Sequence, residues 1–414
     1  MAPSLSKWAR RMKDYGVRFT WLMIPWQAVE PEKGSFRFEK VDTTIDMLIE
    51  LGVEVGVHIM SRSKWATDGP PQSSETDAVS TPPKDLEEYG KFVSTLAGHL
   101  KGRVARYSIE EEAHADGIYF KGTPEQYMAM LAAACKAIHE ADPDAIVQDA
   151  GLSSAALGLL LADDLFKAGK QAEAVSFVNR WFARYGPARG KGEAFETADL
   201  RDVEKLLSDP RAQRVFQWAD LLFDNHDAYD VLQLHYFAPW EQIPAVTDWV
   251  RGRLKARGAD KPIEFWEFGY GWDDVKTYDP EAHARDEVKY LATALGEGAL
   301  RVLSWQFDDY AARMGHPGLF SSDVPRPAAE SFKITAAKLN GTTASERMNL
   351  GADVWGYRFE RKEGWVFVLW SAKPATITLP CGATRVTVTD IKGRSSFADP
   401  KAVDLTISPV FVEK

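Results

Sequence analysis

Short apolar runs alternate with amphipathic stretches along most of the chain, from about residue 17 to residue 309. The runs that predict buried strands are 17–26, 53–60, 104–111, 145–151, 229–237, 261–270 and 300–309. Apolar residues recur at helical spacing in 39–52, 84–100, 123–140, 240–258 and 281–298, and the region 152–225 is mostly helical in pattern. Strands interleaved with helices are typical of parallel βαβ units. This number of units favours an α/β fold of the TIM (β/α)8 barrel type over an open doubly wound sheet.

The first strand of such a barrel is missing from the pattern. Residues 5–16, "LSKWARRMKDYG", predict a helix, and the first apolar run comes only after it. A barrel of seven strands would leave strand edges unpaired. We therefore expect either that an upstream strand is absent or that another segment covers the gap.

The pattern changes after Val324 and Pro325. Short alternating segments separated by Lys-Glu-Gly, Pro-Cys-Gly and Lys-Gly turns predict a C-terminal antiparallel β-sandwich. A helix over 328–341 is expected to link it to the barrel. The predicted domains are therefore a barrel over 1–325 and a β-sandwich domain with its linking helix over 326–414.

Composition and charge narrow the class of partner. The 414 residues carry a formal net charge of −10, which argues against nucleic acid and anionic membranes. Neither G-x-G-x-x-G nor G-x-x-x-x-G-K-[ST] occurs, which weakens nucleotide binding as an alternative. No apolar run approaches transmembrane length, and the N-terminus has no apolar signal-peptide segment, so both the cytoplasm and a trimmed secreted form stay open. The 14 tryptophans and 13 tyrosines mildly favour a carbohydrate-handling protein, because flat rings stack on sugar faces.

Polar and aromatic residues at the strand ends are the candidates for chemistry, because the active site of a (β/α)8 barrel lies at the C-terminal ends of its strands. They are Trp26, His58, Glu110, Glu111, Glu112, Gln148, Asp149, His235, Tyr236, Glu267, Trp305, Gln306 and Asp308. Glu267 stands in the aromatic stretch "PIEFWEFGYGW", a poor place to solvate a carboxylate, and such a burial cost usually signals function or a tight partner. Two glutamates at one barrel mouth are the minimal machinery of glycoside hydrolysis.

Several stretches together resemble a known group of enzymes. "RYSIEEEAHADGIYFKGTPEQY" is similar to the acid/base segment of clan A retaining glycoside hydrolases, especially those near family 39, and "KPIEFWEFGYGW" resembles the nucleophile strand of that clan. "RFTWLMIPWQAVEPEKGSFRFEKVD", "LQLHYF", "VLSWQF" and the C-terminal β segments resemble further parts of these enzymes in the same order. The resemblance implies an oligo- or polysaccharide substrate, no cofactor and no metal.

Residue by residue, the resemblance implies Glu112 as the acid/base and Glu267 as the nucleophile of a double displacement. His235 and Tyr236 would line the subsite of the reacting sugar, and Trp305 would form its stacking floor. Three tryptophans and a histidine are further candidates for substrate binding, with a core role as the alternative for most of them. They are Trp26, Trp65, Trp272 and His58.

The chain departs from the family at Glu111, where relatives carry an asparagine that bonds the sugar 2-hydroxyl. A carboxylate accepts hydrogen bonds but cannot donate them as an amide does, and its charge raises the pKa of a neighbouring Glu112. The departure suits an acid catalyst, an altered substrate or, as the alternative function, a catalytically impaired carbohydrate-binding protein on the same barrel. Glu110 or Glu111 could instead pair with Arg62 or Arg106, and a metal site around His114 is disfavoured because no second histidine lies at ligand spacing.

Overall fold

The structure is a computed structural model that describes residues 3–69, 79–115, 117–182, 198–269, 278–308 and 318–414. The chain divides into two compact units. Unit 1 comprises Met1–Lys13, Arg18–His235 and Asp248–Glu264, and unit 2 comprises Asp14–Val17, Tyr236–Thr247 and Phe265–Lys414.

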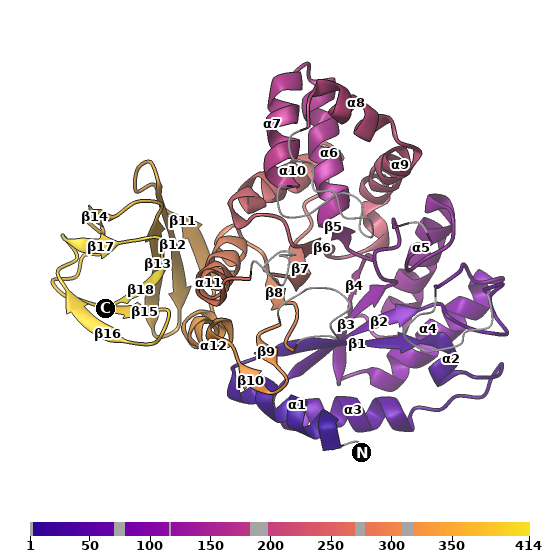
Figure 1. Cartoon of the computed structure of the whole chain (residues 1–414). Helices are drawn as coiled ribbons and strands as arrows, with labels where there is room; N and C mark the ends of the chain where they lie inside the picture. Colours follow the sequence, from indigo (N-terminus) through magenta and orange to yellow (C-terminus); the bar gives the residue numbers. More distant parts are fainter. Residues whose placement is uncertain (1–2, 70–78, 116, 183–197, 270–277, 309–317) are drawn as a thin grey trace. The chain divides into compact units, whose positions relative to one another are not determined.

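Unit 1 is built on a parallel sheet whose strands follow one another in chain order (Figure 1). The first four strands are β1 Phe19–Pro25, β2 Glu54–Met60, β3 Val104–Ile109 and β4 Ile146–Gln148, and each pairs in parallel with the next. β5 Leu152–Ser153 pairs in parallel with β6 Leu232–Tyr236, and Gln148 forms a parallel bridge with Val231 just before β6. Successive neighbours with helical connections are the arrangement expected of repeated βα units.

The predicted strands and the structure agree closely. β1 to β4, β6, β7 Ile263–Phe268 and β8 Arg301–Ser304 each lie inside one of the seven predicted apolar runs. β2 is buried along six of its seven residues, as expected for a strand covered on both faces. Among the described residues, no strand precedes the first helix, α1 Pro3–Asp14, which agrees with the predicted helix at 5–16.

The helices of unit 1 lie in the connections between these strands. They are α2 Trp26–Val29, α3 Glu39–Glu50, α4 Leu86–Leu100, α5 Pro124–Ala141, α6 Ser154–Lys167, α7 Gln171–Trp181, α8 Leu200–Ser208, α9 Pro210–Asp224 and the 3-10 turn η1 His226–Ala228. α5 begins with a capping box, in which Thr123 accepts from the backbone of Gln126 and Gln126 accepts from the backbone of Thr123. α10 Ile243–Lys255 belongs to unit 1 from Asp248 onward.

Unit 2 contains the ends of β6 and β7 together with β8. The amide of Gly269 donates to the carbonyl of Tyr236, and the amide of Trp305 donates to the carbonyl of Phe268 at 2.7 Å. The 3-10 turn η2 Trp240–Gln242, the largely buried helix α11 Pro280–Gly296, the short hairpin of β9 Phe320–Ser321 and β10 Val324–Pro325, and α12 Pro327–Leu339 follow. α11 and α12 pack against each other, and α12 is the linking helix predicted at 328–341.

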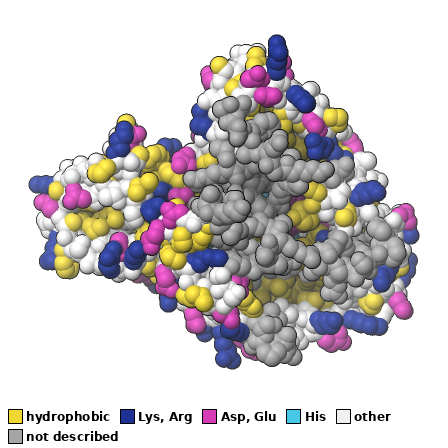
Figure 2. All heavy atoms as spheres, in the orientation of Figure 1, with side chains coloured by type: hydrophobic (Ala, Val, Ile, Leu, Met, Phe, Trp, Pro, Cys, Tyr) yellow, Lys and Arg dark blue, Asp and Glu magenta, His cyan; other side chains and the backbone are white. Residues whose placement is uncertain are grey.

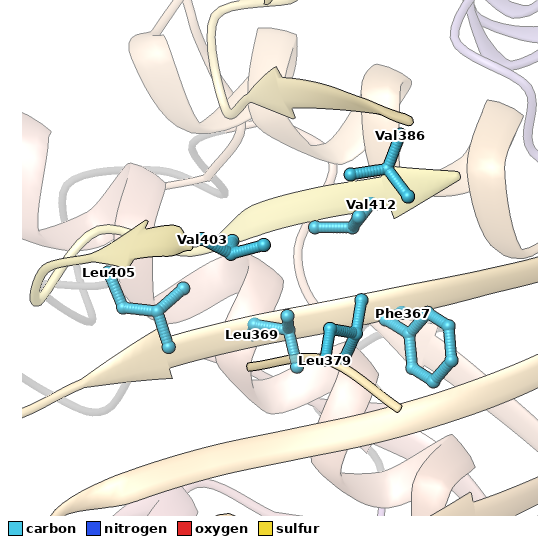
Figure 3. Close-up of a cluster of buried hydrophobic side chains, with 7 residues drawn as sticks. All are labelled: Phe367, Leu369, Leu379, Val386, Val403, Leu405 and Val412. Carbon is cyan, nitrogen blue, oxygen red and sulfur yellow. The ribbon is translucent and has the colours of Figure 1, made fainter. Parts of the chain in front are cut away.

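The C-terminal part of unit 2 is antiparallel, as predicted. Its larger sheet has the order β11 Ala344–Arg347, β12 Val354–Arg361, β13 Gly364–Ser371, β18 Val410–Glu413, β15 Val386–Asp390 and β16 Ser395–Ala398. A two-stranded sheet of β14 Ala375–Ile377 and β17 Val403–Leu405 accompanies it. Figure 3 shows the apolar cluster that both sheets share, with Val403 and Leu405 on one side and Phe367 and Leu369 of β13 on the other.

Charged side chains of both signs lie on the surface of the protein (Figure 2). On the face drawn in Figure 2, acidic and basic side chains are interspersed, so the net charge of −10 is not gathered there into one patch. No helix in the described ranges is both long and apolar enough to span a bilayer.

Candidate active site

The three glutamates after β3 occupy a sharp bend of the backbone. Glu110 and Glu112 both have positive φ angles, 66° and 35°, which residues other than glycine rarely adopt. Strand alternation therefore stops at Ile109, and each of the three carboxylates turns to a different partner. Strained backbone of this kind is held only where the surroundings fix it, and it gathers at functional sites.

The side chain of Tyr127 in α5 anchors this bend through hydrogen bonds. Its hydroxyl donates to the carbonyl of Ile109 at 3.1 Å and accepts from the amide of Ala150 at 2.7 Å. The amide of Glu112 in turn donates to the carbonyl of Ala150 at 2.7 Å. One buried phenol therefore connects the end of β3 with the segment that follows β4.

Glu110 has a structural environment. Its side chain is fully buried, and one oxygen accepts from the amide of Ser61 at 2.6 Å, at the end of β2. Burial raises the pKa of Glu110, while hydrogen bonds from Ser80 and Ser61 and the charge of Arg62 act in the opposite direction. The predicted pairing with an arginine therefore applies to Arg62, as an electrostatic attraction. The alternative partner is wrong, because Arg106 bonds Glu54 and Glu264 instead.

Glu111 lies between two histidines. Its Oε2 is 3.1 Å from Nδ1 of His58, and its Oε1 is 3.5 Å from Nδ1 of His235. Glu111 is 4% exposed and both histidines are fully buried. The ring of Trp21 lies 4.5 Å from that of His58. His58 is thus a buried partner of Glu111. This environment resembles the core role that was the alternative to substrate binding for His58.

Glu112 is the most accessible of the three carboxylates, with 15% of its side chain exposed. Its Oε1 lies 3.1 Å from Nδ1 of His235, the same nitrogen that Glu111 approaches. A carboxyl group that is partly exposed and held by one directional partner can exchange a proton with a bound molecule.

His235 is held tightly on its other side. Its Nε2 is 2.7 Å from the side-chain nitrogen of Gln233. A methyl group on Gly151 would lie 2.5 Å from the same Nε2, so this position requires glycine, and its φ of +77° also favours glycine. Asp149 accepts from the amides of Gln233 at 2.7 Å and Gly151 at 3.1 Å, and burial raises the pKa of Asp149 to about 7.

Sequence reasoning missed Gln233 and Gly151. Gln233 stands two residues before His235 on the same strand, and side chains two apart share a face, so alternation could have found it. His114, considered only as part of a disfavoured metal site, bonds Ser153 at 2.8 Å, and burial lowers the pKa of His114 to about 4. It is therefore a neutral neighbour of the site at ordinary pH.

The tryptophans predicted for substrate binding lie in several environments. Trp26 is fully buried, donates to Glu30 at 2.6 Å and stacks on Phe92, which is the environment of a core residue. Trp65 is partly exposed, packs edge-on against Trp26 and donates to the carbonyl of Glu30. Trp272 lies outside the described residues.

In unit 2, the other predicted residues lie on the ends of β6 and β7 and just beyond β8. Glu267 is on β7 and is 9% exposed. Tyr236 is fully buried and donates to the carbonyl of Pro239 at 2.7 Å, and burial raises its pKa far above the usual range. Trp305 follows β8 and is partly exposed.

The chain is similar to known glycoside hydrolases. A family model described as the beta-galactosidase of glycoside hydrolase family 42 matches residues 3–84. A curated beta-xylosidase of Caldicellulosiruptor saccharolyticus is 27% identical over 117 residues, which is 27% of this chain and 24% of that relative. The resemblance to clan A glycoside hydrolases of the family 39 kind is confirmed.

Solved structures with the same fold cover nearly the whole chain. A family 39 glycoside hydrolase from Bacteroides cellulosilyticus WH2 matches with a TM-score of 0.65 at 15% identity, over 99% of this chain and 77% of its own. A monomeric beta-xylosidase from Caulobacter crescentus CB15 matches with a TM-score of 0.61 at 12% identity, over 100% of this chain and 92% of its own. At these identities the structural likeness establishes the fold.

Proposed function

We propose that this protein is a retaining glycoside hydrolase in which Glu112 is the acid/base and Glu267 the nucleophile. The observation that carries the proposal is the bend after β3, which leaves Glu112 partly exposed and 3.1 Å from His235 while Glu110 and Glu111 are buried. The position of Glu267 on β7 supports the second role, because catalytic carboxylates of barrel enzymes lie toward strand ends.

The proposed reaction is a double displacement. Glu112 protonates the departing oxygen while the carboxylate of Glu267 attacks the anomeric carbon and forms a glycosyl ester. Glu112, now ionised, then takes a proton from the water that cleaves this ester, so the product keeps the configuration of the substrate. The mechanism requires the two carboxyl groups about 5–5.5 Å apart.

Other residues have supporting roles in the proposal. His235 donates to the ionised form of Glu112, and Glu111 adds a nearby negative charge that raises the pKa of Glu112. Trp305 and Trp65, which are partly exposed, would line the subsite of the reacting sugar, whereas the fully buried Tyr236 would support it from the interior. We further propose that residues 1–325 form a (β/α)8-type barrel and that 326–414 form its β-sandwich domain, supported by the match of solved relatives to nearly the whole chain.

The relatives suggest which sugars to test first. Two of them are named as beta-xylosidases, and the family model is described as a beta-galactosidase. We propose a β-linked xyloside as the first substrate class, with β-galactosides second.

The deciding experiment is hydrolysis of a panel of aryl β-glycosides by the wild-type protein and by Glu112→Gln and Glu267→Gln. We expect retained product configuration by proton NMR, loss of turnover in both variants, and labelling of Glu267 by a 2-fluoroglycoside. Inverted product, or full activity of Glu267→Gln, would exclude the double displacement. Sugar binding without turnover in the wild type would favour the catalytically impaired alternative, for which the comparisons give no support.

A further inference from the structure

The two ring nitrogens of His235 face chemically different partners. Nδ1 faces oxygen atoms of two carboxyl groups, at 3.1 Å from Glu112 and 3.5 Å from Glu111. Nε2 faces the side-chain amide nitrogen of Gln233 at 2.7 Å. His235 and Gln233 are both fully buried, so water does not replace the contact between them.

The identity of the Gln233 atom determines the proton on the ring. A side-chain amide nitrogen only donates, so Nε2 of His235 must accept and carry no proton. The single ring proton then sits on Nδ1, where it is donated toward the carboxylates. The ring is neutral in this arrangement, although two nearby carboxylates favour the positively charged form.

The surrounding groups act in different directions on this ring. Glu111 and Glu112 favour the imidazolium, as does Asp149, whose charge interacts with His235. Complete burial favours the neutral form, and the neighbouring His114 is itself uncharged at ordinary pH. The side-chain amide of Gln233 favours the neutral ring, because its N–H donates to a lone pair on Nε2.

The carboxyl group of Asp149 supports both Gln233 and the backbone beside the ring of His235. Asp149 accepts from the backbone amide of Gln233, which anchors the strand position of the amide side chain. The same group accepts from the amide of Gly151, whose missing side chain leaves space for the ring. Asp149 thus helps to hold Gln233 and the ring of His235 in position relative to each other.

We propose that Gln233 is a positioning residue that keeps His235 neutral with its proton on Nδ1, so that Glu112 faces a hydrogen-bond donor without a full positive charge. A cation at this distance would stabilise ionised Glu112 and weaken it as a proton acceptor and as an acid matched to neutral pH. The catalytic part of this inference rests on the proposed function, whereas the state of the ring does not.

The test measures the ring directly by nitrogen-15 NMR of histidine-labelled protein. The His235 signals are assigned as those that His235→Asn removes. We expect the wild type to show one protonated and one unprotonated ring nitrogen between pH 6 and 8, with the proton on Nδ1. An imidazolium or a proton on Nε2 in the wild type overturns the inference, whether or not the protein hydrolyses any sugar.

The variant Gln233→Glu supplies the second readout. Its carboxylate accepts from Nε2–H, so we expect both ring nitrogens to become protonated. In an active enzyme, the alkaline limb of kcat/KM should then move to lower pH by about one unit, because a positive charge within hydrogen-bonding distance lowers a carboxyl pKa by roughly 1–3 units. Gln217→Glu, on the exposed face of α9, is the matched control and should change neither signal nor profile.

Failure of the two parts is distinguishable. If Gln233→Glu protonates the ring and the alkaline limb stays in place, the catalytic part is wrong. If the wild-type ring is neutral on Nδ1 and no glycoside is hydrolysed, the proposed function fails and the role of Gln233 in fixing the ring stands.

Discussion

Replacing Glu111 by glutamine tests the electrostatic reasoning about the acid/base group. Glu111 and Glu112 each place an oxygen within 3.5 Å of the same nitrogen of His235, so these oxygens are no more than about 7 Å apart. At an effective dielectric constant of about 20, two unit charges at that distance repel by about 2 kcal/mol, which corresponds to between one and two pKa units. Glu111→Gln removes this repulsion and keeps the shape of the side chain.

The assay is the pH profile of kcat/KM for the aryl glycoside that the wild type cleaves best. The alkaline limb of this profile reports the pKa of the acid group in the free enzyme. Because the repulsion raises the pKa of Glu112, its removal should move the alkaline limb to lower pH by about one to two units. The exposed Glu140→Gln on α5 removes the same charge at a distance and should leave the limb in place. An alkaline limb that stays fixed or moves to higher pH in Glu111→Gln would refute the reasoning.

Three further changes test other parts of the structure. Gly151→Ala should lower the melting temperature and the activity, because its Cβ would meet the ring of His235 at 2.5 Å. The control Gly169→Ala has a similar positive φ and open space around it, so it should show only the backbone cost of about 1 kcal/mol. Equal losses in the two variants would contradict the steric argument. Burial raises the pKa of Glu287 to about 7, above the value near 4.5 of the unfolded chain, so its contribution to stability is present below pH 4.5 and is lost as the pH rises through 7. Glu287→Gln should remove up to about 3 kcal/mol of this pH dependence in denaturant unfolding, and parallel curves for wild type and variant would show that Glu287 does not titrate in this range. Finally, dialysis against EDTA should leave glycosidase activity unchanged, and a loss that zinc or magnesium restores would point to a metal-dependent reaction.

The strands were predictable because each is a nearly uninterrupted apolar run, and the start of α5 because its capping residues are local signals. Tertiary contacts determine the site, and these were harder to predict. The three glutamates look equivalent as letters, yet two positive φ angles send Glu110 to Ser61, Glu111 to His58 and Glu112 to His235. Those angles depend on groups supplied from other strands and from α5, which no local pattern encodes.

The tryptophans also show that tertiary contacts cannot be read from the local sequence. Trp26 follows a strand and was a reasonable candidate for a sugar platform, but Phe92 of α4 and Glu30 enclose it completely. Aromatic residues at strand ends serve both core and subsite, and the sequence does not record which surfaces the helices cover. Gln233 was overlooked although strand alternation places it on the same face as His235, because its contact with the ring appears only in the structure.

The hydrogen bonds of Tyr127 separate the placement of the glutamates from the loop that follows them. Residues 113–122 lead from Glu112 to the start of α5, yet the bend that carries the glutamates is anchored through the hydroxyl of Tyr127, the fourth residue of α5. Part of that connection also packs in the interior, because Ala113 and Phe120 are fully buried and His114 bonds Ser153. Only its exposed residues can therefore change while the carboxyl groups stay where they are. An insertion between Thr123 and Tyr127 would instead rotate the phenol away from Ile109 and Ala150. A loop graft that leaves the carboxyl groups undisturbed must therefore keep the buried residues Ala113 and Phe120, the His114–Ser153 bond and the capped start of α5.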